Sequence, residues 1–300
     1  MSKTLDGLQF LSGFLAAARN LQQQKETLNQ LNVFPVADRD TGINMALTIK
    51  KTADQLPASG TPAQIMEEAC LSLLEYSHGN SGTILALFFE GFTAALPQET
   101  AVNGHQLARA FQQGADLAWS GVAHPVAGTI LSVASQSAEA GLSMTEITDD
   151  AGQIMKRITD EAHAALLLTP LQNPVLRACR TADAGALGFC LILDGLLEAF
   201  APEYPPLSYP PLKLPEAPVS SDMPLTQRYC TEFVLSLREE AEEVQLRQVL
   251  QPLGEFFLLV SRGPLCKVHI HTNDPKKVLT LASGFGTLQS TKTEDMTQQV

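Results

Sequence analysis

Seven prolines among the eighteen residues 201–218 limit most strongly what this 300-residue chain can fold into. Proline has no backbone N–H and a fixed φ, so neither a helix nor a central strand continues through such a segment. We therefore expect two domains, at residues 1–200 and 223–300, joined by a linker at residues 201–222. The linker is either an extended, semi-rigid spacer or an ordered arm lying on a domain surface.

Helical periodicity runs through almost all of the first 200 residues. Residues 61–77 show it best, with Thr61 as N-cap, Pro62 at the first helical position and Gln64 completing a capping box. Residues 83–96 are apolar nearly all round, which indicates a central, buried helix. Further helices are expected near residues 5–29, 42–56, 104–119, 127–140, 145–167, 171–179 and 184–200. This series predicts an all-α antiparallel helical bundle or barrel.

The residues after the linker predict a small α+β sandwich of the ferredoxin-like kind. Strands are expected at residues 228–237, 255–261 and 266–272, and helices at residues 238–253 and 274–286. Asp274 is placed to cap the second helix, with Pro275 at its first position. A domain this small gains from additional bracing, such as a bound metal.

Charge and cysteine content narrow the class of protein. The formal net charge is −12, which argues against a nucleic acid partner, although a polyphosphate can bind an acidic protein through metal ions. The five cysteines are scattered and odd in number, as in a reduced cytosolic protein. The N-terminal residues form a better amphipathic helix than a signal peptide, and no apolar run is long enough to span a membrane. We expect a cytoplasmic protein.

The stretch NVFPVADRDTGINM, residues 32–45, carries two aspartates two positions apart. In the non-helical segment that Pro35 imposes, Asp38 and Asp40 point the same way and form a good start to a magnesium site. Asn32 could add an amide oxygen if the loop curls. The following Thr41–Gly42 step would place free backbone N–H groups beside the metal, where they bind phosphate oxygens. The alternative is a plain acidic loop in which Asp40 caps the next helix.

Three further loops of small residues precede expected helices. HGNSG at residues 78–82 exposes backbone and supplies Asn80 and Ser81 as donors, unless it is a simple helix–helix turn. HPVAGTIL at residues 124–131 and TADAGALG at residues 181–188 follow the same pattern, and the last contributes Asp183. These loops and the acidic loop could gather at one end of the bundle.

A second group of residues has metal-ligand character. His269 and His271 alternate on one expected strand and therefore share a face, while Cys266 has the opposite parity and belongs to the core. Cys230 lies on a strand that could be adjacent, and it shares a face with Glu232. Cys-His-His suits Zn²⁺ and leaves a fourth position open, with Glu232 as a further ligand or a partner of one. The zinc either braces the small domain or helps to position an acyl phosphate or its acceptor.

Four stretches, taken together and in order, resemble the nucleotide-binding domain of bacterial fatty acid kinases. They are NVFPVADRDTGINM, GNSGTIL, HPVAGTIL and TADAGALG. That domain is similar to the ATP-binding DhaL subunit of dihydroxyacetone kinase. The later stretches YCTEF and KVHIHTNDP resemble the middle domain of the same family, so the resemblance covers essentially the whole chain.

The resemblance implies a helical barrel whose loops at one end hold ATP or ADP with two Mg²⁺ ions. It implies magnesium ligation by Asp38 and Asp40, which are also the residues expected to be catalytic. It also implicates Cys230, His269 and His271 in the zinc site. The remaining nucleotide-side positions that it implies are Asn32, Thr41, Gly42, Asn44, Asn80, Ser81, Gly82, Thr129 and Asp183.

The sequence departs from the family pattern in several places. Arg39 replaces the usual glycine between the aspartates, Ile43 replaces a threonine, and His78 stands where arginine is common. A side chain at Arg39 restricts backbone approach, and its guanidinium could pair with a phosphate. Family members usually continue into a domain resembling DegV-like fatty-acid-binding proteins, whereas this chain stops at Val300, as a naturally short protein or as a fragment.

Three functions are consistent with these features. The first is an ATP-dependent kinase acting on a small carboxylate or hydroxyl substrate, for which the resemblance implies a fatty acid held by a separate DegV-like carrier protein. The second is a dihydroxyacetone-kinase-like reaction, which needs a substrate-holding partner that this chain lacks. The third is a regulatory protein that binds nucleotide without turnover. A homodimer is compatible with each of them.

Overall fold

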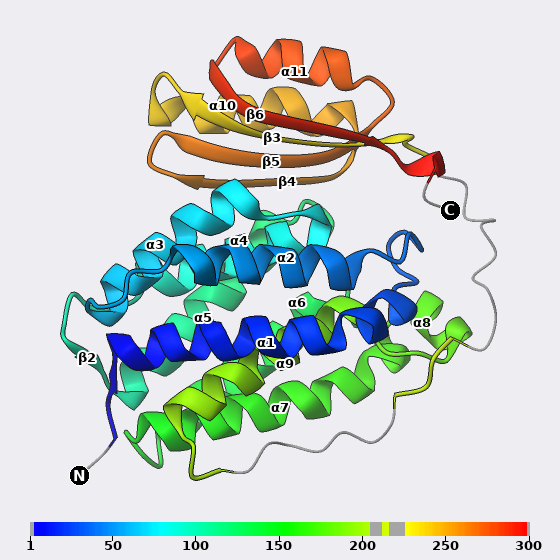
Figure 1. Ribbon diagram of the computed structural model, residues 1–300. Coiled ribbons are helices and arrows are strands. Elements are labelled where there is room, and N and C mark those ends of the chain that lie inside the picture. The colour runs from blue at the N-terminus through cyan, green and yellow to red at the C-terminus, as the bar shows by residue number, and fades with distance from the viewer. Residues whose placement is uncertain (1–2, 205–211, 216–225, 299–300) are drawn as a thin grey trace.

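A computed structural model of the chain describes residues 3–204, 212–215 and 226–298 (Figure 1). Antiparallel helices form a closed ring in which α1 to α7 pack in sequence and α9 packs on both α7 and α1. The short helix α8 follows α7, and strand β1 (Leu5–Asp6) pairs with β2 (Ala101–Val102). The prediction of an all-α helical barrel is confirmed. The helices are α1 (Gly7–Leu31), α2 (Thr41–Gln55), α3 (Pro62–Tyr76), α4 (Gly79–Ala94), α5 (Gly104–Gly121), α6 (Ile130–Met144), α7 (Ala151–Gln172), α8 (Pro174–Cys179) and α9 (Ala184–Phe200).

Local sequence explains where the helices begin and which of them is central. The capping box of Thr61 and Gln64 forms at the start of α3, as predicted. Helix α7 begins at Ala151 rather than near residue 145, because Asp150 caps it. The expected central helix is α4, whose Phe88, Phe89 and Phe92 form a buried aromatic cluster.

The antiparallel order of the ring places four connections at the same end. A chain that runs up one helix and down the next returns to that end at every second connection. The connections α1–α2, α3–α4, α5–α6 and α8–α9 therefore meet there, on the right of Figure 1. These connections contain the acidic loop and the three small-residue loops.

Much of the expected linker, residues 201–222, lies outside the described residues. In its described part, Leu212 packs against the barrel core. The Thr181 hydroxyl also donates a hydrogen bond of 3.0 Å to the Lys213 carbonyl. These residues thus lie on the barrel surface, as in the arm alternative.

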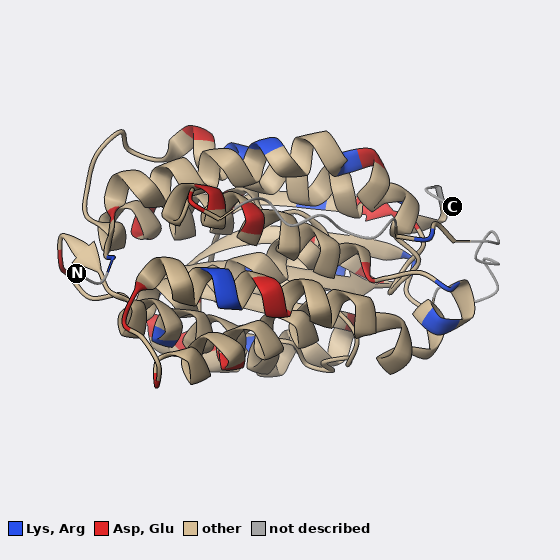
Figure 2. Ribbon diagram, turned by 90° about the horizontal axis from the view of Figure 1, so that it is seen from below, with Lys and Arg blue, Asp and Glu red and all other residues tan. Residues whose placement is uncertain are grey.

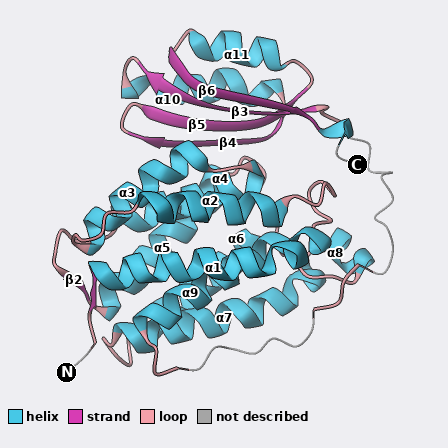
Figure 3. Cartoon of the chain, viewed as in Figure 1, coloured by secondary structure: helices cyan, strands magenta, loops and turns pink. Residues whose placement is uncertain are grey.

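The small domain has the order βαββαβ of a ferredoxin-like fold (Figure 3). Its elements are β3 (Tyr229–Leu237), α10 (Glu243–Leu250), β4 (Glu255–Arg262), β5 (Leu265–Thr272), α11 (Pro275–Ser283) and β6 (Gly286–Asp295). The sheet is antiparallel in the order β4-β5-β3-β6, and the expected α+β sandwich is confirmed. The expected helix at residues 238–253 is shorter than predicted, because 3₁₀ turns at Glu240–Glu242 and Gln251–Leu253 flank α10. Strand β6 was not predicted.

Strand β4 belongs to the cores of both domains. Its Phe257 and Leu259 pack with the small-domain core, whereas Leu258 and Val260 pack with the barrel core. The sheet therefore lies between the layer of α10 and α11 and the barrel helices α3 and α4 (Figure 1). An ion pair of 2.9 Å between Arg262 and Glu90 also crosses the interface. Successive side chains of a strand point to opposite faces of the sheet, so one strand can contribute to two cores.

The surface of the barrel carries mixed charge. Lys and Arg lie among Asp and Glu on the face seen in Figure 2. Within the described ranges, no helix is both long and apolar enough to cross a bilayer.

Candidate functional site

Two adjoining pockets lie where the four loops meet the small domain. The first, called the polar pocket, is lined by Asp38, Asp40, Asn44 and the start of α4 on one side. The small domain lines its other side with Cys230, His269, His271, Lys292 and Glu294. The second, called the apolar pocket, lies along the loops that precede α6 and α9. Pro35, Asn80 and Ser81 line both pockets, so the two are adjacent.

Asn32 organises the acidic loop. Its Oδ1 accepts hydrogen bonds from the Asp40 N–H, the Thr41 N–H and the Thr41 hydroxyl, at 3.2, 3.0 and 2.7 Å. Its Nδ2 donates to the Val36 carbonyl at 2.8 Å. Asn32 thus closes the loop, and these three donors occupy the oxygen that was expected to face a metal.

Asp40 stands at the N-cap position of α2, but its side chain makes no capping hydrogen bond. The alternative of a plain capped loop therefore fails, since the amide of Asn32 satisfies the helix start. The carboxylates of Asp38 and Asp40 both line the polar pocket. They are placed as a pair of hard oxygen ligands would be.

The expectation of free N–H groups at Thr41 is wrong. The Thr41 N–H donates to Asn32, and the Ile43 N–H donates to the Asn29 side chain at 3.1 Å. Gly42 has a packing role, because a Cβ there would lie 2.0 Å from the Lys25 carbonyl oxygen of α1. This close approach lets α2 lie against α1 and fixes the direction of the acidic loop.

The acidic pair is electrostatically unfavourable without a cation. Burial, together with the charge of the neighbouring Asp40, raises the pKa of Asp38 to about 8. A divalent cation between the two carboxylates would remove that repulsion and release the proton. The residues present therefore fit a magnesium site.

The α3–α4 connection and the first turn of α4 supply another face of the polar pocket. Gly79 has φ +65°, and a Cβ there would lie 2.7 Å from the Asn44 side-chain nitrogen, so only glycine fits comfortably. Asn80 and Ser81 follow in the first turn of α4, where backbone N–H groups have no partner within the helix. Gly82 is buried under this turn, where a Cβ would lie 2.9 Å from the Thr48 hydroxyl.

The loops before α6 and α9 form the polar rim of the apolar pocket. Asp183 caps both helices, because its Oδ1 accepts from the Ile130 N–H at 3.1 Å and the Ala186 N–H at 2.7 Å. Burial raises the pKa of Asp183 to about 6. Thr129 is the N-cap of α6, and its hydroxyl donates to the Val126 carbonyl at 2.8 Å. Both residues line the apolar pocket.

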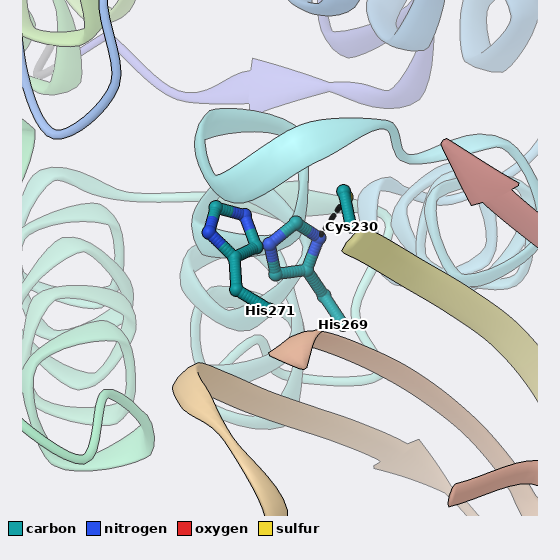
Figure 4. A group of neighbouring side chains, drawn as sticks. All are labelled: Cys230, His269 and His271. Carbon is teal, nitrogen blue, oxygen red and sulfur yellow. Dashed lines mark hydrogen bonds between the residues drawn. The ribbon is translucent and has the colours of Figure 1, made fainter. Parts of the chain in front are cut away.

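Cys230, His269 and His271 come together across β3 and β5 (Figure 4). One ligand atom from each lies within 4.8 Å of the others, and the two imidazole centroids are 5.0 Å apart. The buried His269 Nε2 has no hydrogen-bond partner among the described residues. Burial and the neighbouring His269 lower the pKa of His271 to about 3, which keeps its ring in the neutral form that binds metals. The donor set fits zinc, and Cys266 is buried in the core as its parity predicted.

Glu232 connects this cluster to the barrel. Its Oε1 accepts from His269 Nδ1 and from the Gly79 N–H, each at 2.8 Å. Burial alone would raise the pKa of Glu232, but the hydrogen bond from His269 and the nearby His78 and Lys267 hold it well below its usual range. A carboxylate on Nδ1 fixes the ring so that Nε2 is the free ligand.

Lys267 completes the buried network between the domains. Its ammonium lies 3.9 Å from Glu232 and donates to the Ser77 carbonyl of the barrel at 2.9 Å. Burial lowers the pKa of Lys267. The same few side chains therefore hold the histidines, the first turn of α4 and the domain interface in one arrangement.

Sequence reasoning missed several residues that line the two pockets, among them Lys292, Glu294 and Phe256. Lys292 and Glu294 come from β6, whose polar sequence GTLQSTKTED gave no strand signal apart from its alternating threonines. Phe256 comes from a bulge in β4, where the pairing with β5 shifts between Glu255 and Leu258. A bulge has no reliable signature in a single sequence.

A helical barrel with acidic and small-residue loops at one end, covered by a ferredoxin-like domain, defines a two-domain protein of the kinase-related class. The DAK2 domain family matches residues 35–198, and the family of middle domains of fatty-acid-kinase-like proteins matches residues 226–300. The chain belongs to the DAK2 domain family. The resemblance to fatty acid kinases noted in the sequence is thereby confirmed.

Curated relatives align along the whole chain. Protein YloV of Bacillus subtilis is 33% identical over 312 residues, which cover 99% of this chain and 56% of that protein. An uncharacterized protein of Staphylococcus saprophyticus is 31% identical and covers 100% of this chain and 56% of its own length. The chain thus spans little more than half the length of these relatives.

Among solved structures, the dihydroxyacetone kinase of C. freundii in its native form aligns with a TM-score of 0.44 and 18% identity. That alignment covers 64% of this chain and 34% of the kinase. The same kinase in complex with AMP-PNP and Mg²⁺ aligns with a TM-score of 0.45 and 20% identity, covering 64% of this chain and 33% of the kinase.

Replacing Glu232 with alanine should destabilise the protein strongly. The change removes the carboxylate from the buried Lys267 and His269 and from the partly buried Gly79 N–H, and breaking a buried ion pair typically costs about 3–5 kcal/mol. Urea unfolding measures it, with the exposed Glu239→Ala as the matched control on the same domain. Equal stability of the two variants would contradict the role given to Glu232.

Replacing Arg39 tests the backbone of the acidic loop. Arg39 has φ +58°, a left-handed conformation that costs side chains about 1 kcal/mol relative to glycine. Its side chain is exposed between two pocket-lining aspartates. Arg39→Gly should therefore exceed Arg39→Ala in unfolding free energy by about 1 kcal/mol. Both variants remove the guanidinium, so they differ only in the cost of the left-handed backbone. A higher melting temperature for Arg39→Ala than for Arg39→Gly would contradict the strain assigned to this position.

Proposed function

We propose that this chain is the nucleotide-binding part of a kinase that transfers the γ-phosphoryl group of Mg-ATP to a small acceptor. The observation that carries the proposal is the adjacency of the two pockets, which share Pro35, Asn80 and Ser81 in their linings. The acidic pair and the first turn of α4 face the polar pocket, and mostly apolar side chains line the adjoining one. A nucleotide has the same two parts, a metal-bound polyphosphate and a flat base.

In this proposal the polyphosphate occupies the polar pocket. Asp38 and Asp40 hold one or two Mg²⁺ ions, which would neutralise the charge on the transferring phosphoryl group. Asn80 and Ser81 orient phosphate oxygens through the N–H groups and side chains of the first turn of α4. Asn44, packed against Gly79, keeps the acidic loop and that turn in register. Asn32 holds the acidic loop closed around the ligands.

The acceptor side of the polar pocket is formed by the small domain. Cys230, His269 and His271 would hold a zinc ion with one position left open, and such an ion attracts an acceptor carboxylate or the acyl phosphate product. Because the cluster lines the same pocket as the acidic pair, we favour this positioning role over a purely bracing one. Glu232 would keep His269 oriented towards the ion.

A carboxylate acceptor suits a chain whose sequence offers no evident general base. A carboxylate already bears the charge of a nucleophile and needs no proton removed, unlike a hydroxyl. We therefore favour a fatty acid presented by a separate DegV-like carrier protein, with acyl phosphate as product. A dihydroxyacetone-type acceptor would instead need a base and a second, substrate-holding protein.

Removal of the acidic pair should abolish phosphoryl transfer. Asp38→Ala combined with Asp40→Ala is expected to lower ATP consumption with carrier-bound fatty acid by at least about 100-fold, because one metal clamp is lost. Asp116→Ala, an exposed aspartate on α5, is the control. Activity that survives the double change would refute the magnesium assignment. Tight Mg-ADP binding by the unaltered chain without turnover on any carrier would favour a regulatory role.

Purified protein should contain about one zinc per chain, since three ligands suffice for a site with an open position. Elemental analysis measures the metal. His269→Ala combined with His271→Ala should remove it, whereas the exposed His105→Ala should not. Stoichiometric zinc in the double variant would place the site elsewhere.

A further inference from the structure

Phe256 stands out as a strained aromatic residue beside the proposed nucleotide site. Its φ is +50°, a conformation that a bulky side chain adopts only when its surroundings impose it. The ring is 38% exposed, although neighbouring Phe257 is buried in the small-domain core. Strain of this kind tends to persist where function needs it.

The surroundings do impose this conformation. A Cβ on Gly254 would lie 2.0 Å from the His271 carbonyl oxygen, so the chain passes close to β5 just before Phe256. Glu255 pairs with His271, and the register then shifts before Leu258. Leu258 in turn bridges to Val122 of the barrel. The bulge is therefore held from both sides and from both domains.

This conformation places the ring on the apolar pocket. Phe256 and Leu258 are the contributions of the small domain to its lining, and the barrel supplies the rest, including Ile84, Val126 and Ile130. The Phe256 ring also lies 5.1 Å from the His271 ring of the metal cluster. One aromatic side chain thus borders both the apolar pocket and the cluster.

The apolar pocket has the character of a site for a flat ring. Most of its lining side chains are apolar, with a few polar groups among them, as in small-molecule sites generally. Its polar side chains, Asn80, Ser81, His124, Thr129 and Asp183, come from the barrel, and Asn80 and Ser81 also line the polar pocket. A base held there would have its phosphates directed at the acidic pair.

We propose that Phe256 of the second domain is a wall of the base pocket and stacks on the nucleotide base. The inference rests on the proposed function, because it assumes that the phosphates occupy the polar pocket. It adds that base recognition depends on the docked second domain as well as on the barrel. Stacking on an aromatic ring tolerates any base, so the contribution is to affinity for nucleosides over bare polyphosphate.

The test compares Mg-ADP with Mg-pyrophosphate by calorimetry on the full 300-residue chain. Phe256→Gly removes the ring and relieves the backbone strain. We expect it to weaken Mg-ADP binding by about tenfold, to leave Mg-pyrophosphate binding unchanged and to melt no lower than wild type. Phe256→Tyr should keep the affinity for Mg-ADP. Val249→Ala, which trims an apolar side chain of α10 that is 37% exposed, should change neither affinity.

Each contrary result has a distinct meaning. Unchanged Mg-ADP affinity in Phe256→Gly, with wild-type protein that binds, overturns this inference and leaves the proposed function standing. Equal weakening of Mg-ADP binding and Mg-pyrophosphate binding also overturns it. The ring would then support the loops around the phosphates and would not contact the base. Wild-type protein that binds neither probe overturns the proposed function itself.

Discussion

The buried carboxylate of Glu232 is the interaction on which the arrangement of the site depends. It accepts from His269 of the small domain and from the first N–H of α4, each at 2.8 Å. A charge so deeply buried is tolerated only with good partners, and Lys267 and the two donors provide them. Because one side chain serves the Cys-His-His cluster, the first turn of α4 and the domain interface, none of the three can move without disturbing the others.

The fold could be predicted from sequence to the extent that its signals were local. Capping residues such as Thr61 and Asp274 mark helix starts, and the alternation of His269 and His271 identified a strand with two faces. Strand β6 escaped because it is an edge strand whose exposed threonines and charges resemble a loop. The sequence also could not predict that Leu258 packs in the barrel core and Phe257 in the small-domain core, because both residues are apolar.

The candidate site was predictable in its residues and less so in their roles. The Asn32 oxygen and the Thr41 N–H were expected to face a ligand, but they bond to each other inside the acidic loop, and Gly42 packs closely against α1. Such roles depend on how a loop closes, which residue spacing does not determine. Arg39 illustrates the same point: its backbone is left-handed, a conformation that favours glycine, and the arginine adopts it at a cost in strain.

The position of β4 links ligand binding to domain docking. Its inner face packs into the barrel core, and its bulge presents Phe256 to the apolar pocket. A ligand that contacts both domains binds the docked state better than the separated one, so its binding free energy adds to the free energy of docking. The same linkage works in reverse, because changes that loosen Glu232 or Leu258 lower the population of the state that binds. Under the proposed function, a bound nucleotide would therefore favour the docked state, in which the small domain lines one side of the polar pocket.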